Sequence, residues 1–231
     1  MTRISAISAG LAAALLPLAS GIAHDADASV TRLPCWAGYS YSGVASPALA
    51  FGVSGTVTMQ SPAVVGNGHV AAWIGVGGTG LGPGGSDEWL QGGIAHEAGG
   101  TDVLYVEYKQ PGDANATFVP LRKVDVGEAH SVVVYERAAH RDSWRVMIDN
   151  ERIGEPVTLP GSHGRFSPIA TAESWDGGVA GSCNRYGFRF SSLAVRSQFG
   201  GKWRAFRVSR VLRDPAYRMT LRRSGFSTSS R

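Results

Sequence analysis

Three polar side chains could carry chemistry, and each lies on a predicted strand rich in aromatic and small residues: Gln91, Glu107 and Glu173. A carboxylate with an ordinary pKa of about 4.3 can take a proton from water in acid and return it to a leaving group. An amide N–H can donate a hydrogen bond to an oxyanion. A single Glu on a strand is, however, more often an exposed edge residue than a catalytic one, so the residues alone leave both interpretations open.

The motifs of the common hydrolytic and nucleotide chemistries are missing from the sequence. The six His residues form no His-Glu-x-x-His pattern, which argues against a zinc site. There is no Gly-x-Ser-x-Gly elbow and no Walker loop. The closely spaced carboxylates that several sandwich glycosidases carry on one strand are also missing. We therefore expect no metal and no cofactor.

Two neighbouring segments, residues 71–78 and 89–94, are predicted strands joined by a Gly-rich turn. Because side chains alternate along a strand, Trp73 shares its face with Gly residues, and Trp89 shares its face with Gln91. The opposite faces are aliphatic and belong to a core. Two Trp and one Gln above small residues resemble a binding groove. A tightly curved sheet that needs Gly for its twist explains the pattern equally well.

The rest of the chain repeats short β-rich segments separated by Gly, Pro, Asn and Asp turns. It has 231 residues with 31 Gly and 17% charged residues, and no helix-length apolar periodicity follows residue 30. We therefore predict an all-β fold, a two-sheet antiparallel β-sandwich of about ten strands. The expected strands are residues 36–39, 51–58, 71–78, 89–94, 103–108, 130–136, 143–148, 168–173, 186–190 and 203–211.

The first residues have the pattern of a secretory signal peptide. One Arg precedes an apolar run over residues 4–23, and small residues allow cleavage after Ala23 or Ala28. No other stretch is long and apolar enough to cross a bilayer. We expect a signal peptide over residues 1–28 and a single β-sandwich domain over 29–231. The mature protein should be secreted and not membrane-bound.

The sequence holds two cysteines, Cys35 and Cys183. An oxidising compartment makes a disulfide the default for an exported chain. The bond would close a loop of about 150 residues, which is worth about 4–5 kcal/mol by chain entropy. Two free buried thiols are the alternative.

The net charge of +4 is unevenly distributed. Residues 202–231 hold nine Lys or Arg and one Asp, whereas residues 29–201 hold twelve basic and fifteen acidic side chains. A basic segment can attract nucleic acid or anionic surfaces. No aromatic-basic recognition motif accompanies it, so we interpret it as a solvated face and expect no nucleic-acid partner. We expect a monomer.

Seven segments between residues 35 and 195 resemble, in order, those of the glutamic peptidases, also called eqolisins. No single motif is specific, but seven in the right order are hard to obtain by chance. The segments are Trp36-Ala37-Gly38-Tyr39, Val53-Ser54-Gly55-Thr56-Val57-Thr58, Ala72-Trp73-Ile74-Gly75-Val76, Leu90-Gln91-Gly92-Gly93, Tyr105-Val106-Glu107-Tyr108, Thr171-Ala172-Glu173 and Tyr186-Gly187-Phe188-Arg189-Phe190.

The resemblance implies a concanavalin A-like sandwich of the lectin and glucanase type, an acid-active endopeptidase, and a catalytic pair formed by Gln91 and Glu173. The partner would then be a polypeptide substrate. A non-catalytic module that binds extracellular glycan or peptide in the same groove is the alternative. The residues expected to bind substrate are Trp73, Trp89, Tyr105, Glu107 and Trp175.

The chain departs from the family pattern at three positions. Gly77 and Ala95 stand where the family has acids that flank the pair and that we expect to orient it. Ser174 follows Glu173 directly, so the expected Trp is displaced by one residue, to Trp175. The resemblance therefore transfers the fold more safely than the activity.

Overall fold

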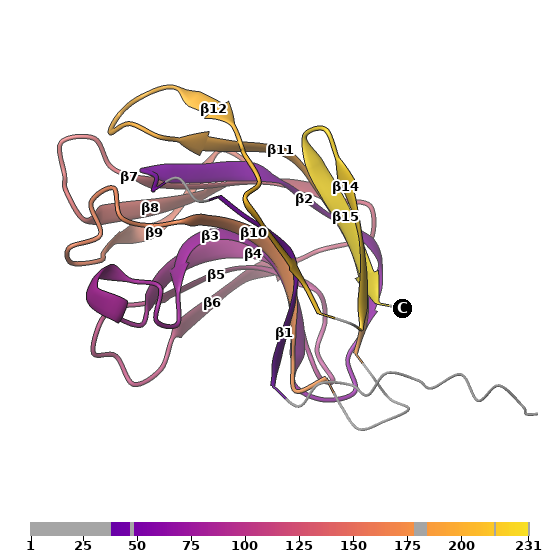
Figure 1. Cartoon of the computed structure of the whole chain (residues 1–231). Coiled ribbons are helices and arrows are strands. Elements are labelled where there is room, and N and C mark those ends of the chain that lie inside the picture. Colours follow the sequence, from indigo (N-terminus) through magenta and orange to yellow (C-terminus); the bar gives the residue numbers. More distant parts are fainter. Residues whose placement is uncertain (1–37, 47–48, 178–183, 215, 231) are drawn as a thin grey trace, which may run out of the picture. The chain divides into compact units, whose positions relative to one another are not determined.

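The structure, a computed structural model, describes residues 38–46, 49–177, 184–214 and 216–230 (Figure 1). These residues form strands β1 to β15 and one short 3₁₀ turn, η1 (Pro83–Gly85). In these ranges no helix is long and apolar enough to span a membrane. The predicted signal peptide and the predicted Cys35–Cys183 bond lie outside the described residues.

Two antiparallel sheets face each other, which confirms the predicted all-β sandwich (Figure 1). Sheet I contains, in spatial order, β13 (Arg210–Arg213), β1 (Tyr39–Ala45), β10 (Pro168–Trp175), β3 (His69–Gly78), β4 (Glu88–Glu97), β5 (Val103–Lys109) and β6 (Thr117–Lys123). Sheet II contains β14 (Tyr217–Arg222), β15 (Gly225–Ser230), β11 (Arg185–Arg196), β2 (Gly52–Val64), β7 (Ala129–Glu136), β8 (Ser143–Ile148) and β9 (Glu151–Thr158), and β12 (Trp203–Ala205) pairs with β11.

The core fills the space between the sheets and follows the predicted alternation. On β3 the aliphatic side chains at 70, 72, 74 and 76 are buried against sheet II, where Phe188 and Phe190 of β11 are also buried. Fully burying a side chain such as Ile74 or Phe190 stabilises the fold by about 1.5–3 kcal/mol. Because consecutive residues on a strand point to opposite faces, this packing turns the other residues of β3 and β4 away from the core.

The strands at the sheet edges differ from the prediction. β6 and β9 were not among the expected strands. Each contains a proline, Pro120 or Pro156, that cannot donate to a strand ladder. Both lie at an edge, where a missing N–H costs little. The single strand expected over residues 203–211 is instead divided: β12 pairs with sheet II and β13 pairs with sheet I.

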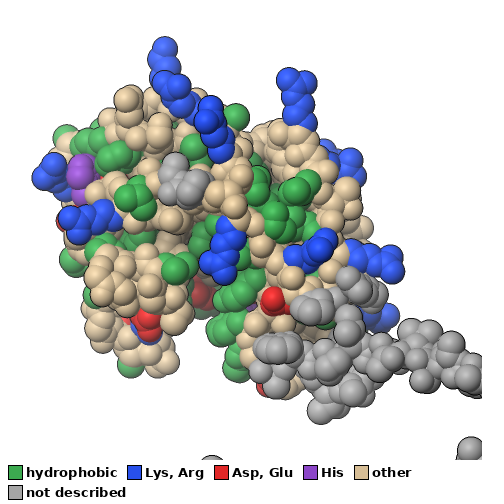
Figure 2. Space-filling view, viewed as in Figure 1, with side chains coloured by type: hydrophobic (Ala, Val, Ile, Leu, Met, Phe, Trp, Pro, Cys, Tyr) green, Lys and Arg blue, Asp and Glu red, His purple; other side chains and the backbone are tan. Residues whose placement is uncertain are grey.

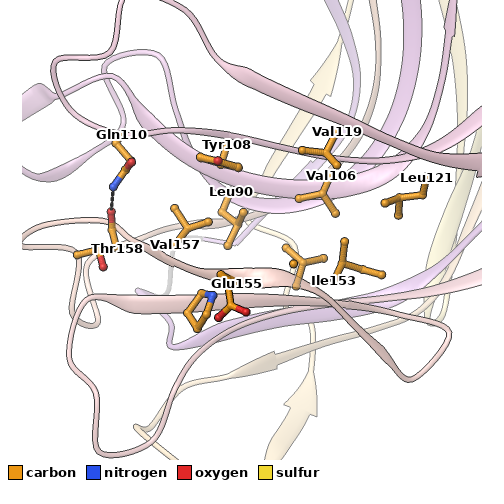
Figure 3. A pocket seen from close by; sticks show the side chains of 13 residues that line it. Leu90, Val106, Tyr108, Gln110, Val119, Leu121, Ile153, Glu155, Val157 and Thr158 are labelled. Atoms are coloured by element: carbon orange, nitrogen blue, oxygen red, sulfur yellow. Dashed lines mark hydrogen bonds between the residues drawn. The ribbon is translucent and has the colours of Figure 1, made fainter.

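A cavity of about 420 Å³ lies between the two sheets near their β6 and β9 edges (Figure 3). Its walls are mostly aliphatic side chains, including Leu90, Val106 and Ile153, and Gln110 of one side donates to the carbonyl of Thr158 on the other at 2.8 Å. Leu90 and Val106 point to the core side of sheet I. The cavity is therefore on the opposite side of this sheet from Gln91, and it plays no part in the site described next.

Candidate functional site

All seven residues predicted to be catalytic or substrate-binding lie on the face of sheet I that is turned away from the sandwich core. Their neighbours in sequence pack in the core, and Trp73 and Tyr105 belong to a separate small apolar cluster on the outer side. The site residues are Trp73 on β3, Trp89 and Gln91 on β4, Tyr105 and Glu107 on β5, and Glu173 and Trp175 on β10.

The Glu173 carboxylate is held by two ring nitrogens. The indole Nε1 of Trp73 donates to Oε2 at 2.8 Å, and the Nε2 of His69 lies 3.1 Å from Oε1. Antiparallel pairing of β10 with β3 sets Glu173 opposite Ala71, one position along the same face from both His69 and Trp73. Each carboxylate oxygen thus has one fixed partner and keeps a further lone pair for water.

The Gln91 side chain is oriented by its neighbour on β5. Its Nε2 donates to the hydroxyl oxygen of Tyr105 at 3.2 Å. Burial raises the pKa of Tyr105 well above its usual value, so the phenol stays protonated. Gln91 and Glu173 form no bond with each other; β3 runs between their strands and carries Trp73 between them. The second amide hydrogen of Gln91 has no partner among the described residues.

A second carboxylate, Glu107, stands directly opposite Gln91 in the β4–β5 pairing. Its Oε1 accepts a hydrogen bond from the indole Nε1 of Trp89 at 2.9 Å. Burial raises the pKa of Glu107, the bond from Trp89 lowers it in part, and the negative charge of Glu173 raises it again. The site therefore combines two carboxylates and one amide on a partly desolvated face.

Sequence reasoning missed His69, although the signal for it was present. His69, Ala71 and Trp73 alternate on β3, so His69 shares the face of Trp73. Its ring stacks on Trp175 with 5.6 Å between centroids and meets the edge of Tyr39 at 6.1 Å. Tyr39 and Trp175 are 52% and 41% exposed, so they form an aromatic rim beside the buried carboxylate.

Two glycines of this face lie where the backbones of β3 and β4 approach closely. A Cβ at Gly93 would lie 1.9 Å from the carbonyl oxygen of Ala72, and one at Gly75 would lie 2.6 Å from the Cβ of Gln91. Real Cβ atoms do not approach that closely. Glycine is therefore required at these two positions by the close approach of β3 and β4.

The three departures from the glutamic-peptidase pattern have local explanations. Gly77 adopts φ +80°, which a side chain at this position would strain, and Ala95 is buried against Trp73 and Tyr105. Ser174 points to the core side, where its hydroxyl oxygen accepts from the amide of Asn184 at 3.2 Å. A Trp at 174 would also point into the core, whereas Trp175 shares the face of Glu173.

The site is less open than the sequence suggested. Gln91 and Glu173 are only 6% and 7% exposed. The hollow visible between the β3–β4 loop and β1 contains acidic side chains (Figure 2). Within the described ranges, no group of three or more His, Cys, Asp or Glu side chains is arranged to hold a metal ion.

No family model and no curated protein matches this sequence. Solved structures do. A scytalido-glutamic peptidase bound to a peptide-based transition-state analogue superposes with a TM-score of 0.58 at 15% identity, covering 83% of this chain and 98% of that one. SCP-B, a member of the eqolisin family in complex with the tripeptide Ala-Ile-His, gives 0.54 at 15% identity, covering 84% and 98%. The chain has a fold similar to that of the glutamic peptidases.

This likeness covers nearly the whole length of each of those enzymes, so the common part is the complete sandwich and not one sheet of it. At 15% identity it establishes the fold, while the chemistry has to be argued from the side chains of this chain.

Proposed function

We propose that this protein is an exported, acid-active endopeptidase of the glutamic type that hydrolyses peptide bonds with Gln91 and Glu173. One observation carries the proposal. Trp73 and His69 hold the Glu173 carboxylate on the same face of sheet I on which Tyr105 orients the amide of Gln91. Export is proposed from the sequence of residues 1–28 alone.

The reaction needs a base, an acid and a donor to the oxyanion. Glu173 takes a proton from a water molecule while the water oxygen attacks the carbonyl carbon of the peptide bond. The free amide hydrogen of Gln91 donates to the oxyanion that forms. Glu173 then gives its proton to the leaving nitrogen as the C–N bond breaks, and the carboxylate is restored.

The aromatic rim supports the binding of an extended ligand beside the pair. Tyr39 and Trp175 present exposed rings next to His69. Such rings suit the apolar side chains of a peptide, and they also suit the stacking of sugar rings. A non-catalytic module for extracellular glycan or peptide is therefore the second candidate function.

The test is cleavage of an acid-denatured protein substrate by the mature chain across pH 2–7. We expect turnover only in acid, about pH 2–5, where a carboxyl group exchanges between base and acid. Glu173→Gln should abolish it, because an amide cannot accept the proton of water. Gln91→Ala should slow it by about 10²–10³, the scale of losing one oxyanion donor. Inhibitors of serine, cysteine and metal-dependent enzymes should have no effect.

Glu155→Gln is the matched control, since Glu155 is an exposed carboxylate on the edge strand β9. It should cleave like the wild-type protein. Wild-type protein that is inert at every pH while it binds a glycan would decide for the binding module. Equal cleavage by wild type and Glu173→Gln would show that Glu173 is only a structural residue.

A further inference from the structure

His69 stands between Glu173 and the solvent. Its Nε2 lies 3.1 Å from Glu173 Oε1, and the His69 side chain is 27% exposed against 9% for Glu173. The other oxygen of the carboxylate is held from the opposite side by Trp73. A water molecule that approaches Glu173 therefore meets a carboxylate whose direction is fixed at both oxygens.

Aromatic rings hold the imidazole of His69 in place. It stacks on Trp175 with an angle of 30° between the rings, and its plane makes an angle of 62° with Tyr39. A cation placed over an aromatic face is stabilised by the ring quadrupole. The surroundings thus fix the orientation of His69 and also favour its protonated form.

The charged groups that act on His69 are all carboxylates, so their charges are negative. The titratable groups facing it are Tyr39 and Tyr41 on β1, Glu97 on β4, Glu107 on β5 and Glu173 on β10. Burial raises the pKa of both tyrosines, so they stay neutral. Burial lowers the pKa of His69, but the bond to Glu173 and the three carboxylate charges outweigh it, and the net shift is upward from 6.5.

We propose that His69 is a positioning residue for the proposed peptidase reaction, whose imidazole aims the Glu173 carboxylate at the attacking water. This inference rests on the proposed function. A carboxylate that is bonded at both oxygens cannot rotate away from the water that it must deprotonate. His69 thereby supplies an orienting contact that Gly77 and Ala95 cannot supply.

The role predicts a loss of kcat that another hydrogen-bond donor restores in part. His69→Phe keeps a ring beside Trp175 and Tyr39 but cannot donate to Glu173, whereas the amide of His69→Gln can. At pH 4 we expect kcat to fall by about tenfold in His69→Phe with KM unchanged, and by about threefold or less in His69→Gln. His96→Gln is the control, because His96 bonds Asp102 on the other side of the sheet. A kcat of folded His69→Phe equal to that of wild type, or equal losses in His69→Phe and His69→Gln, would overturn the proposal.

An NMR titration of the imidazoles tests the pair without using activity. In Glu173→Gln the pKa of His69 should fall, because its main partner loses its charge, while the titration of His96 should not change. An unchanged His69 titration would overturn the proposal even if the enzyme is active. Wild-type protein that is inert at every pH would overturn the proposed function instead, and the titration would still decide whether the charge pair exists.

Discussion

The indole of Trp73 offers the sharpest quantitative test of the site. Trp73→Phe keeps an aromatic ring at a buried position but removes the N–H that donates to Glu173 Oε2 at 2.8 Å. A hydrogen bond to a charged group is worth about 1.5–3 kcal/mol. If the whole bond serves to hold the base in its reactive direction, kcat/KM falls by about 10- to 150-fold.

Loss of this hydrogen bond should also lower the free energy of unfolding. For a domain of this size a loss of about 1.5–3 kcal/mol lowers Tm by roughly 3–12 °C. The assay is therefore cleavage at pH 4 together with thermal unfolding followed by circular dichroism. Cleavage is measured at a temperature at which the unfolding curve shows that the variant is still folded, so that the rate reports the site and not the unfolded fraction.

Trp89→Phe is the matched control. It removes an indole N–H that donates to a carboxylate on the same face, Glu107, at 2.9 Å. We expect a loss of rate below about threefold, because Glu107 takes no proton in the proposed reaction. A folded Trp73→Phe that cleaves as fast as wild type would refute the reasoning. So would a Trp89→Phe variant that loses as much rate as Trp73→Phe.

Two further predictions concern stability. Gly93→Ala should cost more than about 3 kcal/mol in chemical denaturation, because its Cβ would lie 1.9 Å from the backbone oxygen of Ala72. Gly92→Ala should cost about 1 kcal/mol or less, because the atoms nearest to its Cβ would be two valine methyl groups at 3.2 and 3.4 Å and a backbone oxygen at 3.5 Å; similar losses for the two would contradict this. The raised pKa of Glu107 means that ionisation of the folded protein costs stability as pH rises through that pKa. Glu107→Gln should therefore have a higher Tm than wild type at pH 7 and an equal one at pH 3, and a lower Tm at pH 7 would contradict this.

Local pattern was sufficient to predict the centre of sheet I. The period of two along residues 69–78 and 89–96 separates core from outer face correctly, because a one-residue slip would turn Ile74 and Leu90 into solvent. The same alternation placed Trp73, Trp89 and Gln91 on one side. For two consecutive strands this follows from β-strand geometry and from the aliphatic pattern of the opposite face.

Long-range pairing could not be predicted in the same way. The bond between His69 and Glu173 joins residues 104 positions apart, and it depends on the register of β10 against β3. The edge strands β6 and β9 lacked a strand signal, since exposed edges tolerate Pro and polar residues. The division of residues 203–213 between the two sheets depends on which strand edges of each sheet are still unpaired. A local sequence pattern does not show which edges these are.

The positions of β1 and β2 in the sheets bear on when the chain can fold. β1 lies between β10 and β13, and β2 lies between β7 and β11. The partners of these two strands are therefore synthesised much later than the strands themselves. Both edges of β1 stay unsatisfied until residues 168–175 and 210–213 exist. Bare strand edges pair readily with other chains. Synthesis of this protein therefore leaves one edge of β1 unpaired, and open to aggregation, until nearly the last residues have been added.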